Sequence, residues 1–294
     1  MISQQKLWTA LITPMLSDGS VDFESLEKLI QRQNNAGNGI LLIGSTGEGL
    51  ALDDEEKKNV VEFAAGLGAE VPLMVGVGGM NIYQQKKWIE HCNTIKIDAF
   101  LLITPLYAKP GPKGQLQWFK KLLDASEKPC MLYNIPSRTG IDLHINVAEQ
   151  LADHPNFWAI KEASGNISVY RQFRERVPSA ALYSGDDALL PAFVPFGSKG
   201  LVSVSSNVWP EETKLYTEMC LRGETESLFP LWGRAAYALF TASNPIPVKK
   251  LLYSNAEITS PELRLPLVQE ELQDLSELKQ IDSEIKNWFK KNNV

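Results

Sequence analysis

Cysteine and histidine, which build disulfide frameworks and most metal centres, are scarce in this 294-residue sequence. It has three of each, and the cysteines, Cys92, Cys130 and Cys220, lie far apart without a Cys-x-x-Cys pair. An odd number of dispersed thiols argues against a disulfide framework and is typical of a reducing compartment. The histidines do not cluster with the cysteines at the spacing of zinc ligands, so we expect no metal site.

Long apolar runs and a surplus of positive charge are also missing. No stretch approaches the length of a membrane span, and the first residues carry no cleavage signature of a secreted protein. The formal net charge of −6 and the lack of a basic block argue against a nucleic-acid-binding surface. We therefore expect a cytoplasmic protein that binds neither membranes nor nucleic acids.

Short apolar runs alternate with helical patterns along most of the chain. The runs lack polar alternation, which indicates strands that are buried on both faces. Eight strands and eight helices follow one another at intervals of about 25–30 residues, which predicts an α/β fold of the (β/α)₈ TIM barrel type. A doubly wound open sheet is the alternative, but it rarely needs eight such regular units. The predicted strands are residues 7–12, 40–43, 73–75, 99–103, 130–134, 158–161, 182–184 and 200–204.

Helix-start signals follow several of these strands. Asp22 is expected to cap the first helix, and Asn81 is expected to cap the helix after the third strand. Asp53 with Glu56 three residues later has the pattern of a capping box. These signals place helices between the predicted strands.

The alternation stops at about Glu224. Apolar residues then recur at helical spacing over 228–239 and again over 272–285, with four prolines between the two stretches. We therefore expect a barrel domain over residues 1–223. A small C-terminal helical domain over residues 224–294 would pack on the barrel or support a subunit contact.

Lys161 ends the sixth predicted strand, after the apolar residues Ala159 and Ile160. A charged amine is costly in an apolar strand, and the usual response is a lowered pKa. The resulting neutral amine can attack a carbonyl and form a Schiff base. Alternatively, the lysine extends to solvent and pairs with Glu162, and the stretch alone favours neither interpretation. Strand alternation puts Glu162 on the opposite face, which leaves Lys161 without an obvious partner in the sequence.

Other reactive residue types stand at the strand ends, where TIM barrels keep their active sites. The loop Gly44–Gly47 is either a tight turn or a site for a small anion, and with a lysine across the mouth we favour a carboxylate. Tyr133 is either a proton carrier for imine formation or an amphipathic core residue. Arg138 is either a carboxylate-binding residue or a surface arginine without a fixed partner.

Two other motifs have simpler interpretations. Asp186 and Asp187 are possible acid/base carboxylates or magnesium ligands, but we favour a cap for a helix beginning near Ala188. The stretch Gly76–Gly79 lacks the full nucleotide-binding fingerprint, so we interpret it as a turn.

Several segments resemble those of a known family. The segments 44–48, 133–140 and 160–165 are similar to signatures of the pyruvate-dependent class I aldolases of the N-acetylneuraminate lyase superfamily, and within it to the dihydrodipicolinate synthase family. The segments 184–187 and 244–249 fit the same family, so the resemblance extends over essentially the whole chain. It implies an enzyme that condenses pyruvate with L-aspartate 4-semialdehyde to 4-hydroxy-tetrahydrodipicolinate, toward diaminopimelate and lysine. Neither a metal nor an organic cofactor would be needed.

The resemblance also implies residue roles. Lys161 would form the imine with pyruvate and Tyr133 would carry protons. Ser45, which takes the place of a usual threonine, would link Tyr133 to Tyr107 in a proton relay. Tyr107 would come from a neighbouring subunit, which implies a homodimer or a dimer of dimers. The implied substrate-binding residues are Thr46 and the backbone of Val202 for the pyruvate carboxylate, Arg138 for the semialdehyde carboxylate, and Gly185.

Members inhibited by lysine usually carry a tyrosine where Leu106 stands, and often histidines near Asp54 and Lys57. Asn81 matches that site, but Leu106 lacks the aromatic hydroxyl, so we expect weak or absent feedback by lysine.

One rival function is another pyruvate lyase, such as N-acetylneuraminate lyase or a 2-keto-3-deoxy-sugar aldolase, which would not usually need Arg138. The other rival function is that of a ligand-sensing barrel without enzymatic activity, which would be expected to lose Lys161 or Tyr133.

Overall fold

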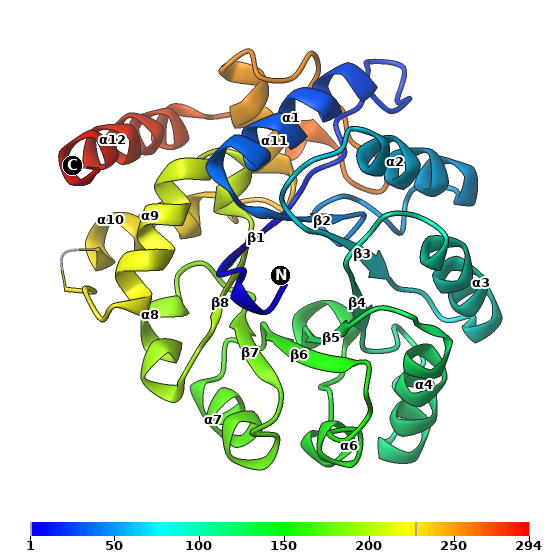
Figure 1. The fold of residues 1–294 in the computed structure, drawn as a ribbon. Coiled ribbons are helices and arrows are strands. Elements are labelled where there is room, and N and C mark those ends of the chain that lie inside the picture. Colours follow the sequence, from blue (N-terminus) through cyan, green and yellow to red (C-terminus); the bar gives the residue numbers. More distant parts are fainter. Residues whose placement is uncertain (1, 227, 294) are drawn as a thin grey trace.

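In the computed structural model, which describes residues 2–226 and 228–293, eight parallel strands form a closed barrel in sequence order (Figure 1). The first strand pairs with the last, through Leu7–Leu201, Trp8–Val202 and Thr9–Ser203. The predicted TIM barrel is thereby confirmed. The strands are β1 (Leu7–Ala10), β2 (Gly39–Leu42), β3 (Leu73–Val77), β4 (Ala99–Ile103), β5 (Cys130–Asn134), β6 (Phe157–Glu162), β7 (Ala181–Ser184) and β8 (Gly200–Ser203).

Burial on both faces explains the continuous apolar runs of the strands. Outward-facing side chains such as Ile40, Phe100 and Ile160 pack under the surrounding helices. Inward-facing side chains, among them Trp8 and Met131, fill the barrel interior. Because the interior is packed, the reactive groups are confined to the ends of the strands.

Helices surround the barrel on its outside (Figure 1). Asp22, Asp53 and Asn81 cap the helices that the sequence assigns to them, and Asp53 forms a capping box with Glu56. The outer helices are α1 (Phe23–Ala36), α2 (Asp54–Gly66), α3 (Ile82–Asn93), α4 (Pro112–Ala125), α5 (Pro136–Thr139), α6 (Ile145–Gln150), α7 (Ile167–Arg176), α8 (Leu190–Phe193) and α9 (Pro210–Leu221). Short 3₁₀ helices are η1 (Ile2–Gln4), η2 (Val194–Phe196), η3 (Ser205–Asn207) and η4 (Gln269–Glu271).

Residues 228–293, which we call the C-terminal segment, contain α10 (Phe229–Ala238), α11 (Ile246–Ser254) and α12 (Ser276–Asn292). Figure 1 shows this segment against the α1 and α9 side of the barrel. Trp232 stacks on Tyr216 of α9, and Trp209 donates to Asp282 of α12 over 2.9 Å. The segment therefore packs on the barrel, whereas the domain boundary at 223/224 stays a prediction.

Several predicted element ends were wrong by one or more residues, and two of them concern the first strand and the last helix. The first strand ends at Ala10 rather than Ile12, because the Ile12 N–H donates to the side chain of Asn207 over 2.9 Å instead of to a strand. The last helix begins at Ser276, so Leu272 precedes it and packs against the core from a non-helical stretch.

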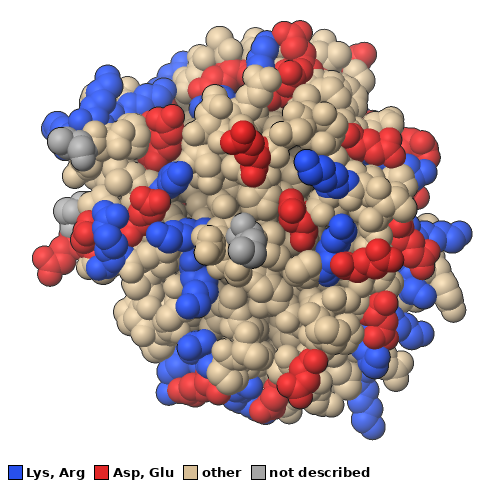
Figure 2. Space-filling view, in the orientation of Figure 1, with Lys and Arg blue, Asp and Glu red and all other residues tan. Residues whose placement is uncertain are grey.

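On the face in view in Figure 2, lysine and arginine side chains are interspersed with aspartate and glutamate side chains. Across residues 2–226 and 228–293, no helix has the length and apolarity that crossing a membrane requires.

Candidate active site

Lys161 lies in β6 with its side chain in the barrel interior. It stands in register between Tyr133 of β5 and Tyr183 of β7, and only 5% of its surface is exposed. Its Nζ lies 4.2 Å from the centre of the Tyr133 ring. The pKa of Lys161 is lowered from 10.5 to about 7, mainly by burial; Asp187 opposes this shift and the Arg138 cation adds to it. A substantial fraction of the amines is therefore neutral at pH 7.

Glu162 does not neutralise this lysine. Its buried carboxylate accepts hydrogen bonds from the Asn134 side chain and from the Ser164 N–H, both over 2.6 Å. In the part of the chain that the structure describes, no carboxylate lies within ion-pair distance of Lys161. The separation of Glu162 from Lys161 that strand alternation predicts is thus confirmed.

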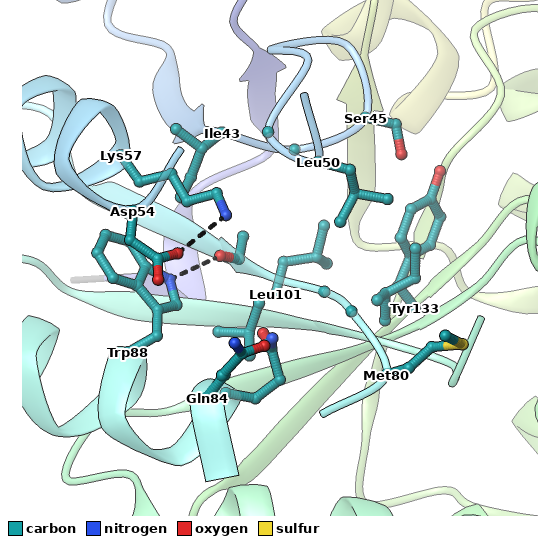
Figure 3. Close-up of a pocket in the computed structure, with 18 residues that line it drawn as sticks. Ile43, Ser45, Leu50, Asp54, Lys57, Met80, Gln84, Trp88, Leu101 and Tyr133 are labelled. Carbon is teal, nitrogen blue, oxygen red and sulfur yellow. Dashed lines mark hydrogen bonds and ion pairs between the residues drawn. The ribbon is translucent and has the colours of Figure 1, made fainter. Parts of the chain in front are cut away.

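Tyr133 is buried beside the lysine, and burial raises the pKa of its phenol well above the usual range. The phenol therefore keeps its proton at neutral pH and is able to donate it. Figure 3 shows the hydroxyl groups of Tyr133 and Ser45 pointing toward one another. Both residues line the same cavity, so the structure brings them together.

Gly185 leaves room for the side chain of Lys161. A Cβ at this position would lie 2.8 Å from Lys161 Cε and 2.7 Å from Ala163 Cβ, which is too close for either contact. The Gly185 N–H is used by the Glu162 carbonyl, over 2.7 Å. Any side chain at residue 185 would therefore displace the lysine.

The loop after β2 carries Ser45 and Thr46 in a tight fold. Thr46 is buried, and its hydroxyl oxygen accepts a hydrogen bond from the Asn244 side chain over 2.9 Å. Glu48 has a φ of +52°, which is rare for a residue with a side chain. At Gly49 an added Cβ would lie 2.0 Å from a carbonyl oxygen, so only glycine fits there.

Asp187 organises the end of β8, where Val202 lies buried in the barrel interior. Its carboxylate accepts hydrogen bonds from the Ser203 hydroxyl, from the Val204 N–H over 3.0 Å and from the Ser205 N–H over 3.2 Å. The predicted helix cap at Asp186 and Asp187 was wrong, because α8 begins only at Leu190 and has no side-chain cap. Asp186 instead closes a turn by accepting from the Ala188 N–H over 2.9 Å.

Arg138 and Tyr107 lie at the rim. Arg138 is exposed on α5, and its guanidinium donates to the Asn244 carbonyl over 3.4 Å. Tyr107 is 85% exposed, so a single chain does not bring it into contact with Tyr133 and Ser45. It has a φ of +59° at the centre of a γ-turn that the Ala108 N–H and the Leu106 carbonyl close over 2.6 Å.

A cavity opens beside Tyr133, between the ends of β2, β3 and β4 and the helices α2 and α3 (Figure 3). Asp54 and Lys57 form an ion pair of 3.5 Å on its wall, and the Trp88 indole donates to the Gly76 carbonyl over 3.1 Å. Sequence reasoning missed Trp88, Gln84 and other α3 residues as lining, since a buried helix face has the same pattern. The full lining is Ile43, Gly44, Ser45, Gly49, Leu50, Asp54, Lys57, Gly76, Val77, Gly78, Gly79, Met80, Gln84, Gln85, Trp88, Leu101, Ile103 and Tyr133.

Sequence reasoning gave no separate role to Asn244, Lys249 or Glu48. All three belong to segments that carry the family resemblance, which was the available signal. Among the described residues, no group of three or more histidine, cysteine, aspartate and glutamate side chains is placed to hold a metal ion.

A buried lysine of lowered pKa, with a protonated phenol beside it on the next strand, is the arrangement that a TIM-barrel aldolase of the lysine Schiff-base class requires. Comparison with known families narrows this class. The model of the dihydrodipicolinate synthetase family matches residues 3–285, and the chain belongs to this family.

Individual relatives agree over nearly the full chain. The chain is 50% identical over 287 residues to a 4-hydroxy-tetrahydrodipicolinate synthase of Francisella philomiragia subsp. philomiragia, covering 97% of each chain. Among solved structures it is similar to the 4-hydroxy-tetrahydrodipicolinate synthase of Methylacidiphilum fumariolicum, with a TM-score of 0.92, 31% identity and 98% of each chain covered. The dihydrodipicolinate synthase of Acinetobacter baumannii, complexed with pyruvate, has a TM-score of 0.86, 32% identity and 99% coverage of each chain.

Proposed function

We propose that this protein catalyses the reaction of a 4-hydroxy-tetrahydrodipicolinate synthase, the condensation of pyruvate with L-aspartate 4-semialdehyde. The observation that carries the proposal is the amine of Lys161, which is buried, has a pKa of about 7 and lies 4.2 Å from the Tyr133 ring centre. The names of the relatives and the pyruvate complex of the Acinetobacter baumannii structure support the two substrates.

The reaction begins at the ketone of pyruvate. The neutral amine of Lys161 adds to this carbon, and loss of water from the carbinolamine leaves an imine. The imine loses a proton from the pyruvate methyl group and becomes an enamine, whose carbon attacks the aldehyde. The amino group of the semialdehyde then attacks the imine carbon, which closes the ring and releases Lys161. Tyr133 moves protons to and from the oxygens in these steps.

The substrate carboxylates are assigned to two places. Thr46 and the backbone of Val202 hold the carboxylate of pyruvate, next to Gly185. Arg138 at the rim holds the carboxylate of the semialdehyde, for which a guanidinium is well suited. Ser45 relays protons between Tyr133 and Tyr107.

Tyr107 requires a second copy of the chain in this proposal. Three other large exposed side chains follow the neighbouring strands β2 and β3, with Leu50 at 61%, Met80 at 57% and Tyr83 at 76% exposure. Such side chains favour burial between subunits of a homodimer or a dimer of dimers. The test is to mix a Tyr107→Phe chain with a Lys161→Ala chain. Each is inactive or impaired alone, and a mixed dimer recovers one complete site if Tyr107 crosses.

The proposal needs no metal or organic cofactor, because the Lys161 imine itself activates the pyruvate carbon. Full activity is expected after dialysis against a chelator. A cytoplasmic location is part of the same proposal and follows from the biosynthetic role.

Borohydride trapping tests the proposed function. Pyruvate with borohydride is expected to leave a three-carbon adduct on Lys161, which peptide mass spectrometry locates. The Lys161→Ala variant is the control and should remain unlabelled. An unlabelled native enzyme would refute the proposal, and addition of different aldehydes after imine formation identifies the second substrate.

A further inference from the structure

Three contacts join the C-terminal segment to the loop that carries Ser45 and Thr46. The Asn244 side chain donates to the Thr46 hydroxyl oxygen over 2.9 Å. Lys249 forms an ion pair of 2.5 Å with Glu48, and the Arg264 N–H donates to the other Glu48 oxygen over 2.8 Å. The loop is thus held by residues about two hundred positions further along the chain.

The ion pair is shielded from water. The side chains of Lys249 and Glu48 are 0% and 2% exposed, and Lys249 also donates to the Glu262 carbonyl over 2.7 Å. A buried ion pair is weak as a source of stability, since an apolar pair of similar volume usually does as well. Displacing either group leaves the other charge buried and unpaired, which is costly. A buried ion pair therefore holds its two charged groups in one geometry.

The loop needs such support. Glu48 is in the left-handed region at a φ of +52°, and Ile43 at the start of the loop has a φ of +48°. Non-glycine residues keep such conformations only where surrounding contacts impose them. The Glu48 carboxylate is the loop's anchor, since both of its oxygens are engaged by the C-terminal segment.

The Asn244 contact decides what the Thr46 hydroxyl is able to do. Because its oxygen accepts from the Asn244 amide, its hydrogen is free to donate elsewhere. A hydroxyl prepared in this way as a donor suits a carboxylate. The Asn244 carbonyl also accepts from Arg138, so one residue contacts both proposed carboxylate-binding side chains.

We propose that Asn244 and the Lys249–Glu48 pair are positioning residues, through which the C-terminal segment sets the loop geometry that recognises the carboxylate of the first substrate. The inference rests on the proposed function, because it takes this substrate to be pyruvate. None of the three residues touches the reacting atoms. They act through Thr46 and Ser45.

Two measurements distinguish a positioning role from a merely structural one: the KM for pyruvate and the rate of borohydride trapping. Asn244→Ala removes one side-chain hydrogen bond without leaving a buried charge, and it keeps the carbonyl contact to Arg138. It is expected to raise the KM for pyruvate about 10-fold, the loss of one well-oriented hydrogen bond to a charged group, with little change in the KM for the semialdehyde. The borohydride-trapping rate at low pyruvate should fall by the same factor.

Lys249→Met and the double variant Glu48→Gln/Lys249→Met extend the test to the ion pair. The double variant leaves no unpaired charge, so it serves where the single variant does not fold. It is expected to raise the KM for pyruvate while the trapping rate recovers at saturating pyruvate. The matched control is Glu257→Gln, which breaks the Arg32–Glu257 ion pair between the C-terminal segment and α1, away from the loop. Its KM for pyruvate should stay unchanged.

Two results would overturn the inference. In one, Asn244→Ala and the double variant keep the native KM and trapping rate and lose only thermal stability. In the other, Glu257→Gln raises the KM for pyruvate as much as they do, which would mean that any loosening of the segment suffices. Native enzyme that fails to trap pyruvate refutes the proposed function itself, whereas trapped native enzyme with unaltered variants refutes only this inference.

Discussion

Among the residues that the structure describes, two lysines are buried, and their surroundings differ. Lys161 is 5% exposed in the barrel interior, with an aromatic ring as its nearest partner and no carboxylate at ion-pair distance among the described residues. Lys249 is fully buried under the neighbouring loop, 2.5 Å from Glu48. Burial lowers the pKa of both amines. A carboxylate opposes the shift at each, Asp187 without an ion pair at Lys161 and Glu48 through an ion pair at Lys249.

The difference separates a nucleophile from an anchor. Without a carboxylate partner, Lys161 has a pKa of about 7 and supplies a neutral amine. At Lys249 the Glu48 carboxylate and the Glu262 carbonyl both accept from the amine, so its nitrogen is held by fixed partners. We therefore expect the buried amine that no carboxylate holds, Lys161, to be the reactive one.

The largest expected effect is on activity. Lys161→Met should lower kcat/KM by at least about 10³-fold, because the covalent intermediate is lost. Lys249→Met should still form the adduct on Lys161. Steady-state rates and peptide mapping after borohydride treatment measure the two effects. An adduct on Lys249 in the native protein or in Lys161→Met would contradict the comparison.

For the free energy of unfolding, we expect substitution of Lys249 to be more harmful than substitution of Lys161. Lys249→Met leaves the Glu48 carboxylate buried and unpaired, so it should lower the free energy of unfolding by about 3–5 kcal/mol, and adding Glu48→Gln should recover most of the loss. Lys161→Met should stabilise the protein at pH 7, because it removes a buried amine that the fold holds below its ordinary pKa.

This stabilisation depends on pH in a defined direction. Between pH 7 and 10.5 the unfolded chain binds more protons at Lys161 than the folded chain, so native stability rises with pH. The advantage of Lys161→Met is therefore full below pH 7 and declines toward pH 10.5. Urea unfolding at several pH values measures it, and a gap that stays constant would contradict the assigned pKa.

Arg138 tests whether the second substrate is recognised apart from the chemistry of Lys161. Arg138→Ala should raise the KM for the semialdehyde about 10- to 100-fold, through loss of a charged hydrogen bond to its carboxylate. The rate of imine trapping with pyruvate should change much less. If both decline equally, the role assigned to Arg138 is wrong.

The smallest expected effect is that of added lysine. Lys57 puts a cation on the wall of the cavity beside Tyr133, and Leu106 lacks a hydroxyl. Inhibition at millimolar lysine should therefore stay below about 5-fold, the lower end of typical allosteric coupling. Leu106→Tyr is the matched variant and should increase sensitivity. Strong inhibition of the native enzyme would contradict the prediction.

The fold was predictable because each strand is buried on both faces and so leaves a continuous apolar run. The ends of the strands were less predictable. For example, β1 is shorter than predicted because the Ile12 N–H donates to the Asn207 side chain. Lys161 could be singled out because it ends an apolar strand, whereas its expected role came from the family resemblance. The role of Asp187 was missed, because its partners at the end of β8 are 16 to 18 residues away.

The support of the site by the C-terminal segment could not be predicted. Asn244 and Thr46 are 198 residues apart, and a pair of polar residues at that separation has no local pattern. A lysine on a helix, such as Lys249, is usually predicted to be exposed, because helical spacing does not reveal that Glu48 lies next to it. The hydrogen bond from the Asn134 side chain, which keeps Glu162 away from Lys161, likewise has no local pattern in the sequence.

The pH dependence of pyruvate trapping on Lys161 tests the central claim most directly. The rate at limiting pyruvate should rise with pH as the amine loses its proton, with a midpoint near 7. Glu48→Gln/Lys249→Met should keep this midpoint while requiring more pyruvate. A midpoint near 10.5, the ordinary value for lysine, would show that Lys161 is charged at neutral pH and would contradict the account.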